Sequence, residues 1–264
     1  RFKGSEVADI VSRSGAKSII FWPLFKKANF LEVLSSIADA AFNEVESVII
    51  YDEEEHDFMS NSYLPSSLQS KKVASYLELI NHSGAEIDHS QPDAGCNIFT
   101  TSGTTRAPKF VLHSHRSISI HASEVWRNLE PLIKSNAFFH TLPFCGVFGF
   151  NHFSAALSGA RPNVIQSAFS AHEAIDLIDR HKVHYISATD DMLLALLEAD
   201  DRNPALPSLT CCGYGAFNLP PEEITLRASA RGIKLVGLYG MSEVQALFAR
   251  QEHTQEDKHR YLPG

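Results

Sequence analysis

Residues 100–109 read Thr-Thr-Ser-Gly-Thr-Thr-Arg-Ala-Pro-Lys, and this decapeptide is the most informative stretch of the chain. The apolar run Cys96-Asn97-Ile98-Phe99 precedes it and Phe110-Val111-Leu112 follows it, which predicts a tight polar connection between two short strands. Its hydroxyls, the backbone N–H groups around Gly103 and the ammonium of Lys109 can converge on one polyanion. We interpret the decapeptide as a phosphate-binding loop, with a Ser/Thr-rich surface turn as the alternative.

The loop differs from the P-loop of nucleoside triphosphatases, which has Gly-x-x-x-x-Gly-Lys followed by Ser or Thr and then a helix. Here Pro108 precedes the lysine and Phe110 follows it. The sequence therefore indicates a phosphate loop of another kind.

Two further segments follow expected strands. The run 233–238 predicts a buried strand, and Tyr-Gly-Met-Ser-Glu occupies residues 239–243 at its carboxyl end, where ligands of open α/β sheets bind. The alternative is a strand end followed by a turn with a surface glutamate. The segment 211–217 follows another short strand, and its small residues allow a planar ligand to approach the backbone closely.

Together these segments resemble the adenylate-forming superfamily, which includes acyl-CoA synthetases, aryl-CoA ligases, luciferases and peptide-synthetase adenylation domains. The decapeptide is similar to the superfamily's Ser/Thr-Ser-Gly-Ser/Thr-Thr-Gly-x-Pro-Lys-Gly, with Arg106 and Phe110 in place of two glycines. Residues 239–243 match Tyr-Gly-x-Ser/Thr-Glu without a departure. Residues 211–217 resemble the Gly-Gly/Ala-Ala-Pro-Leu element more loosely.

The resemblance implies a role for each segment. The catalytic groups would be Lys109, Ser242 and Glu243, and Glu243 would also bind Mg²⁺. The residues that it implies for the phosphates of ATP are Thr101, Ser102, Gly103, Thr104, Thr105, Arg106 and Lys109. Those that it implies for adenine are Gly213, Tyr214, Gly215, Ala216, Tyr239 and Gly240.

A fourth segment, residues 142–150, resembles the superfamily's Leu-Pro-x-Phe-His-x-x-Gly element, with Gly146 in place of the histidine. The resemblance implies that Phe144, Cys145 and Gly146 line an acyl pocket; plain core is the alternative. Peptide-synthetase adenylation domains carry an aspartate near here that binds the substrate ammonium, and this stretch contains none. We therefore expect a fatty or aryl acid rather than an amino acid.

Composition predicts a soluble enzyme domain. The chain has 264 residues, 44% hydrophobic and 20% charged, with a mean hydropathy of −0.11 and a net charge of −8. Such a chain can bury a core, and no apolar stretch approaches the ~20 residues of a membrane span. Its negative charge argues against nucleic acid as the main partner.

The cysteines and histidines predict no metal or disulfide framework. The four cysteines are Cys96, Cys145, Cys211 and Cys212. They lack Cys-x-x-Cys spacing, which favours free thiols and a cytoplasmic location. His113 and His115 alternate along the strand expected after the loop, so their side chains would face the same side. They could form a metal pair or be polar strand positions near the cleft. We favour the second interpretation because no third ligand has suitable spacing.

Strand and helix patterns alternate along the chain, which predicts an α/β fold of two subdomains with mainly parallel sheets flanked by helices. We place the subdomains at residues 1–134 and 135–264, with the active-site cleft between them. A helix is expected over residues 73–80 and another over 115–133.

The resemblance implies ATP-dependent activation of a carboxylic acid to an acyl-adenylate with release of pyrophosphate. We expect transfer to a thiol to follow, on coenzyme A or a carrier protein. The alternatives are a catalytically impaired nucleotide-binding relative and an unrelated α/β protein. The chain is expected to be a fragment that lacks the C-terminal domain and is weakly active alone.

Overall fold

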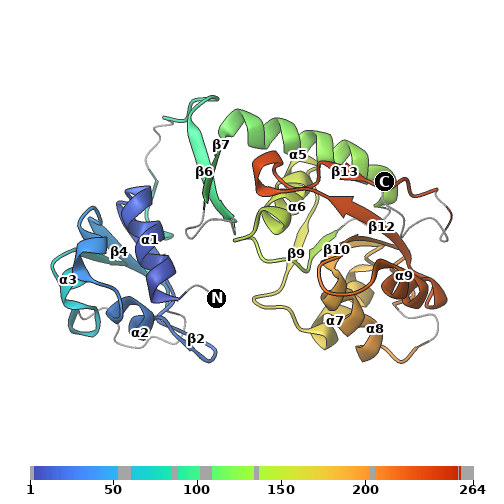
Figure 1. Cartoon of the computed structure of the whole chain (residues 1–264), viewed down its shortest axis with the longest axis horizontal. Helices are drawn as coiled ribbons and strands as arrows, with labels where there is room; N and C mark the ends of the chain where they lie inside the picture. Colours follow the sequence, from blue (N-terminus) through green and yellow to red (C-terminus); the bar gives the residue numbers. More distant parts are fainter. Residues whose placement is uncertain are drawn as a thin grey trace. The chain divides into compact units, whose positions relative to one another are not determined.

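The computed structural model describes residues 3–52, 61–84, 89–101, 109–133, 137–202, 206–254 and 256. Within these residues, packing divides the chain into two compact units, one up to residue 84 and one from residue 89 onward (Figure 1). The boundary expected between residues 134 and 135 falls inside the second unit. Packing therefore divides the chain at a different place, and the expected subdomain boundary stays a prediction.

The first unit contains a parallel sheet with strand order β1-β4-β5. The bounds of its strands are β1 Ser18–Phe21, β2 Leu24–Phe25, β3 Ala28–Asn29, β4 Ser47–Ile50 and β5 Lys72–Ser75. Its helices are α1 Gly4–Ser14, α2 Phe30–Ser35, α3 Ser66–Gln69 and α4 Tyr76–Leu79, with 3-10 turns at Asp39–Phe42 and Asn61–Tyr63. Phe42, Val48 and Leu68 are almost fully buried in its core.

The helix expected over residues 73–80 is wrong in its first part. Residues 72–75 form β5, in which Val73 pairs with Val48 of β4. The helix α4 begins only at Tyr76, where the Ser75 side chain accepts a hydrogen bond from the backbone N–H of Glu78. Pairing with a distant strand therefore overrides the local helical spacing.

The second unit alternates strands and helices. Its strands are β6 Gly95–Thr101, β7 Lys109–Ser114, β8 Phe138–His140, β9 Asn163–Ile165, β10 Tyr185–Thr189, β11 Cys211–Gly215, β12 Lys234–Tyr239 and β13 Ala249–Arg250. Its helices are α5 His115–Leu129, α6 Val147–Ser158, α7 Ala171–His181, α8 Asp190–Ala199 and α9 Pro221–Ala230, with 3-10 turns at Glu130–Leu132 and Ser242–Val244. The helix expected over residues 115–133 is confirmed as α5 and the turn after it.

The sheet of the second unit has strand order β10-β11-β12-β13, with the first three strands parallel. β8 and β9 form a separate parallel pair, and β6 and β7 an antiparallel hairpin. The parallel sheets with flanking helices confirm the expected α/β class.

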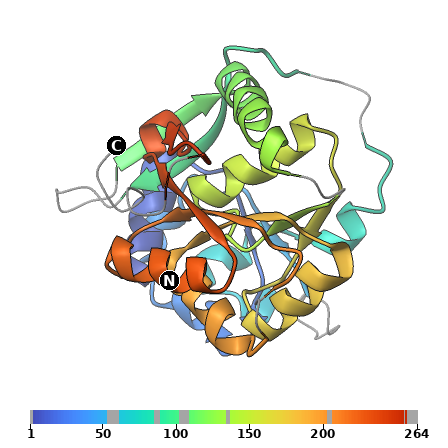
Figure 2. The same cartoon turned by 90° about the vertical axis from the view of Figure 1, so that its right-hand side faces the viewer.

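Helices cover both faces of this sheet (Figure 2). Successive residues of each strand enter different cores: Tyr185 packs with α5 and α6, whereas Ile186 packs with α7, α8 and α9. Cys211 and Cys212 of β11 divide in the same way. Strands buried on both faces in this manner are typical of doubly covered parallel sheets.

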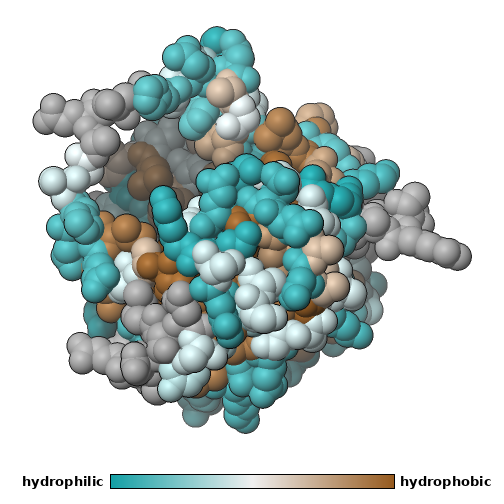
Figure 3. Space-filling view, turned by 90° about the vertical axis from the view of Figure 1, so that its left-hand side faces the viewer, coloured by the Kyte–Doolittle hydropathy of each residue, from teal (hydrophilic) through white to brown (hydrophobic). Residues whose placement is uncertain are grey.

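Hydrophobic side chains also reach the surface. On the face drawn in Figure 3 they lie in several separate areas among hydrophilic residues. The exposed large hydrophobic residues of the first unit include Ile20, Leu79 and Ile80. No helix in the part of the chain that the structure describes has the length and apolar character needed to cross a membrane.

Candidate active site

The carboxyl ends of β10, β11 and β12 meet at one edge of the sheet. The register pairs Thr189 with Gly215 and Tyr214 with Gly237, so the three strands end close together. The segment after β11 and the segment after β12, which lie far apart in the sequence, therefore become neighbours. This is the edge at which open α/β sheets bind ligands.

A cavity of about 310 Å³ lies at this edge. It is lined by Val147, Phe148, Gly215, Ala216, Phe217, Leu238, Tyr239, Gly240, Met241, Ser242, Ala246 and Leu247. Tyr239 is 58% exposed, so its ring is accessible to a ligand. Of the residues expected to bind nucleotide, the structure thus brings together Gly215, Ala216, Tyr239, Gly240 and Ser242.

The strand that leaves the phosphate loop lies beside this motif. The ring Nε2 of the buried His113, on β7, donates a hydrogen bond of 2.7 Å to the carbonyl oxygen of Ser242. Lys109 begins the same strand, opposite Thr101, and is exposed. The expectation that both histidines lie on one strand is wrong for His115, which is the first residue of α5. Their expected place near a cleft between subdomains stays a prediction.

Ser102, Gly103, Thr104, Thr105 and Arg106, expected to bind phosphate, lie outside the described residues. The flanking residues Thr101 and Lys109 are paired with each other. The hairpin β6–β7 therefore brings the two residues that flank the loop side by side.

The backbone after the motif is strained. Gln245, Ala246 and Leu247 have φ values of 58°, 55° and 28°, a left-handed region that non-glycine residues occupy at a cost. Gly240 makes this turn possible, because a Cβ atom there would collide with the Ala246 backbone. Burial lowers the pKa of His121, which lies on α5 near this turn. Strain of this kind is concentrated at ligand-binding sites.

Glu243, the expected magnesium ligand, is exposed in the 3-10 turn that follows the motif. The described residues contain no group of three or more His, Cys, Asp or Glu side chains that could hold a metal by themselves. Mg²⁺ often binds one or two carboxylates together with substrate phosphates. A single exposed carboxylate next to Ser242, which lines the cavity, fits that mode of binding.

Two expected adenine residues lie below the cavity. Tyr214 is 3% exposed and its side chain packs in the core, so only its backbone can meet a ligand. A Cβ atom on Gly213 would collide with the hydroxyl of Tyr185. The glycine thus makes room for a buried tyrosine, an explanation that the local sequence did not indicate.

The expected acyl-pocket residues divide between two places. Phe144 and Cys145 line a second cavity, of about 420 Å³, at the carboxyl ends of β8 and β9. The residues that line it are His140, Thr141, Leu142, Pro143, Phe144, Cys145, Ile165, Gln166, Ser167, Ala168, Phe169 and Met192. Gly146 is the N-cap of α6, whose first residues Val147 and Phe148 line the cavity beside Tyr239. One short segment therefore borders both cavities.

Several lining residues had no functional signal in the sequence. Leu238 and Leu247 have the apolar pattern of any strand or turn. Their place at the cavity depends on which strand ends lie side by side, which local periodicity does not encode.

Comparisons with known proteins agree with this geometry. A family model described as "AMP-binding enzyme" matches residues 1–264. The 2-succinylbenzoate–CoA ligase of Bacillus subtilis is 28% identical over 169 residues, covering 63% of this chain and 34% of the relative. The 3-methylmercaptopropionyl-CoA ligase of Ruegeria lacuscaerulensis is 27% identical over 247 residues, covering 91% of this chain and 43% of the relative.

Solved structures show the same fold. The anthranilate CoA ligase AuaEII in complex with anthranoyl-AMP has a TM-score of 0.71 and 19% identity, over 94% of this chain and 45% of that one. The o-succinylbenzoate CoA synthetase of Bacillus subtilis with ATP and magnesium has a TM-score of 0.64 and 18% identity, over 95% and 55%. The present chain spans less than half the length of these curated relatives.

Proposed function

Because this chain belongs to the AMP-binding enzyme family, we propose that its protein activates a carboxylic acid with ATP and forms an acyl-adenylate. The observation that carries this proposal is the hydrogen bond from His113 to Ser242. It joins the strand that leaves the phosphate loop to the motif that borders the cavity. Strand β7 and the motif at 239–243 thereby lie in one packed unit.

The proposed reaction is an in-line displacement at the α-phosphorus of ATP. A carboxylate oxygen of the acid forms a bond to this phosphorus while the bond to the pyrophosphate oxygen breaks, and pyrophosphate leaves with the electron pair. The negative charge on the phosphates is the main obstacle, so positioning and charge neutralisation supply most of the catalysis.

Each residue has a proposed part in this step. Lys109 and the loop residues 101–106 bind the β- and γ-phosphates, and the ring of Tyr239 stacks on adenine above Gly215 and Ala216. The hydroxyl of Ser242 contacts the α-phosphate. Glu243 holds Mg²⁺, which offsets phosphate charge when it is bound.

The acid is proposed to be a fatty or aryl acid that enters beside the segment 144–148, where the two cavities approach each other. Transfer to the thiol of coenzyme A or a carrier protein follows, with AMP as the leaving group. The names of the relatives support coenzyme A, since they are CoA ligases of organic acids. The cytoplasmic location expected from the cysteine spacing of the sequence stays a prediction.

The test is ATP–pyrophosphate exchange by the full-length protein with a panel of fatty and aryl acids. We expect at least one acid to support exchange, and Lys109→Met and Glu243→Gln each to lower its rate about 100-fold. Lys72→Met and Glu222→Gln are matched controls on exposed residues that are not among those lining the cavity, and should leave the rate unchanged.

Calorimetry with ATP·Mg²⁺ separates the proposal from the catalytically impaired relative. An impaired relative whose loop no longer binds phosphate would release no heat that depends on Lys109 and would support no exchange with any acid. Exchange that is indifferent to both Lys109 and Glu243 would contradict the proposed site.

A further inference from the structure

The carboxylate of Asp190 is fully buried and accepts four backbone hydrogen bonds. Its Oδ2 accepts from the N–H groups of Phe217 at 2.9 Å, Asn218 at 2.7 Å and Leu219 at 2.7 Å, and its Oδ1 from that of Asp191 at 3.0 Å. Burial acts to raise the pKa of Asp190, but these N–H groups outweigh it and the pKa is lowered. The residue therefore stays ionised, and its charge is satisfied by backbone alone.

The loop held by Asp190 is one wall of the cavity beside Tyr239. Ala216 and Phe217 line that cavity, and the next two residues supply N–H groups to the carboxylate. The ring of Phe217 lies over Gly215, at whose Cβ position its nearest atom would be only 2.6 Å away. Moving the Asp190 hydrogen bonds would move this wall.

A second buried network holds another wall of the cavity, formed by the first turn of α6. The Nδ1 atom of His152 lies 3.0 Å from the carbonyl oxygen of Phe148. Burial lowers the pKa of His152 to about 3, so the ring is neutral. A carbonyl only accepts, so Nδ1 carries the proton and Nε2 accepts a hydrogen bond of 2.6 Å from the Ser187 hydroxyl.

The chain of hydrogen bonds continues into the sheet. The Tyr185 hydroxyl donates to the Ser187 oxygen at 2.9 Å, and the Thr141 hydroxyl donates to the Ser187 carbonyl at 2.5 Å. Each group in this chain donates to the next one: Tyr185 to Ser187, Ser187 to His152, and His152 to the carbonyl of Phe148. Such ordered chains are rigid because each bond polarises the next.

We propose that β10 and the residue after it position both walls of the nucleotide cavity, through Ser187 on one side and Asp190 on the other. Neither is among the described residues that line the cavity, so both are positioning residues. β10 carries none of the recognised motifs, yet it sets the separation between Phe148 and Phe217. This inference rests on the proposed function, because ATP is the ligand that the walls would hold.

The test measures the KM for ATP in pyrophosphate exchange, and the Kd for ATP·Mg²⁺ by calorimetry, on the full-length protein. In Asp190→Asn an NH₂ group replaces one of the two oxygens that accept N–H groups. We expect it to raise KM and Kd about tenfold with a smaller change in kcat. Ser187→Ala should raise them about threefold, because His152 loses its donor.

Two matched controls isolate the positioning role. Asp191→Asn removes the same charge from the same turn of α8 but from an exposed side chain. Ser154→Ala removes a hydroxyl from α6 that only binds its own helix, at Phe150. Both should leave KM and Kd unchanged within twofold.

Thermal melting is measured in parallel to detect simple loss of stability. A lowered Tm with unchanged KM and Kd in Asp190→Asn and Ser187→Ala would overturn the positioning role and leave the proposed function intact. If the wild-type protein itself binds no nucleotide and supports no exchange, the proposed function fails as well. The two outcomes are told apart by the wild-type protein, which is active in the first and inactive in the second.

Discussion

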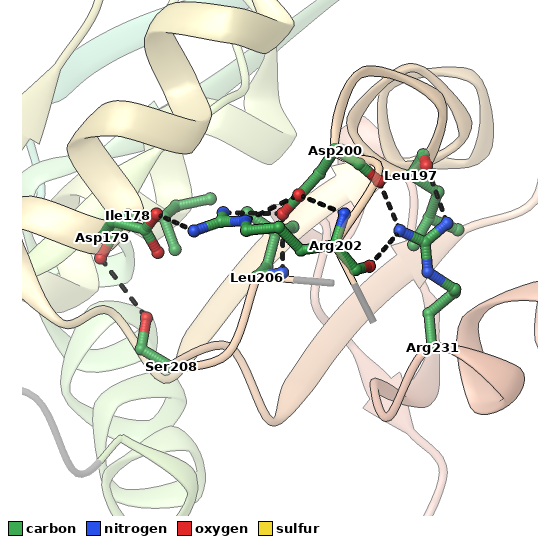
Figure 4. Close-up of polar contacts among 8 residues, drawn as sticks. All are labelled: Ile178, Asp179, Leu197, Asp200, Arg202, Leu206, Ser208 and Arg231. Carbon is green, nitrogen blue, oxygen red and sulfur yellow. Dashed lines mark hydrogen bonds and ion pairs between the residues drawn. The ribbon is translucent and has the colours of Figure 1, made fainter. Parts of the chain in front are cut away.

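Helix α8 carries a buried aspartate at each end, and the two carboxylates are bound in different ways. Asp190, beside the candidate cavity, accepts only backbone N–H groups in its hydrogen bonds. Asp200, which follows the last residue of the helix, binds the Arg202 guanidinium through both carboxylate oxygens at 2.7 Å (Figure 4). It also accepts the N–H of Leu206 at 2.8 Å.

The Asp200 end joins several elements at the edge of the sheet opposite the cavity. Arg202 also binds Asp179 of α7 at 2.6 Å. Arg231, which follows α9, donates to the carbonyl oxygens of Leu197, Asp200 and Arg202 (Figure 4). Guanidinium groups thus connect three helices through side chains that stem from different parts of the chain.

The two aspartates of α8 therefore have different roles, because their hydrogen-bond partners differ. Backbone N–H groups are fixed in the loop, so an acceptor among them determines where that loop lies. Long arginine side chains adjust to the elements that they connect, and they stabilise the fold without defining a cavity. We therefore expect changes at Asp190 to alter ligand binding and changes at Asp200 to alter stability.

The largest expected effect is at the Asp200 end. Asp200→Ala removes one of the two carboxylates that bind Arg202 and the acceptor of the Leu206 N–H, and should lower the free energy of unfolding by about 3 kcal/mol. Urea denaturation measures this loss, while the KM for ATP should stay unchanged. Asp201→Ala, at an exposed neighbouring carboxylate, is the control and should change stability by less than about 0.5 kcal/mol. A rise in the KM for ATP at constant stability would contradict the distinction between Asp190 and Asp200.

Acid titration should reveal the same difference. Hydrogen bonds from Arg202 lower the pKa of Asp200 to about 2. Because this folded-state pKa lies below the unfolded value of about 3.9, the stabilisation is complete above about pH 5 and is lost as pH falls toward 2. The loss should be about 2 kcal/mol. Urea denaturation between pH 2 and 5 should show a shallower decline in Asp200→Ala, and parallel curves for the two proteins would contradict this assignment.

A smaller effect is expected beneath the cavity. Gly213→Ala places a methyl group against the Tyr185 hydroxyl and should cost about 1–2 kcal/mol. In the double variant with Tyr185→Phe the collision is relieved, so the combined loss should be less than the sum of the two single losses. Denaturant unfolding of the four proteins measures the coupling. Gly84→Ala serves as the control, because a Cβ atom added there would meet no atom within 4 Å among the described residues.

The smallest expected effect concerns the second cavity, at the carboxyl ends of β8 and β9, which Met192 of α8 also lines. Cys145 is an exposed thiol in its lining, and a bound acid substrate should slow its alkylation about threefold, because pockets enclose most of a small ligand. Mass spectrometry distinguishes it from Cys96, an exposed thiol on β6 whose rate should not change. Equal slowing at both thiols would indicate a global effect, and no slowing would place the acid elsewhere.

Much of the site could be predicted from sequence because its chemistry is local. The run before Tyr239 forms a strand with the motif at its carboxyl end, as expected. The helix after His113 and Ser114 also begins where the pattern indicated. The helix expected at Val73 failed, because a strand from elsewhere pairs with that segment. The roles of Lys109 and Glu243 stay predictions that the exchange assay tests.

Residues whose importance depends on distant partners could not be found in this way. Asp190 has the sequence context of an ordinary helix start, and Ser187 that of a polar residue in a buried strand. Their partners lie 27 to 29 and 35 positions away. Neither spacing has a period that local patterns could reveal.

The α/β alternation, the hydroxyl-rich composition of residues 100–109 and the motif at 239–243 could be found from the sequence alone, since each depends on neighbouring residues. Tertiary packing was needed to bring His113 to Ser242, 129 positions later, and Ser187 of β10 to His152 of α6. The physical reason is that the order of strands in a sheet selects which buried donors and acceptors meet. Hydrogen bonds between distant segments form only after that order is set.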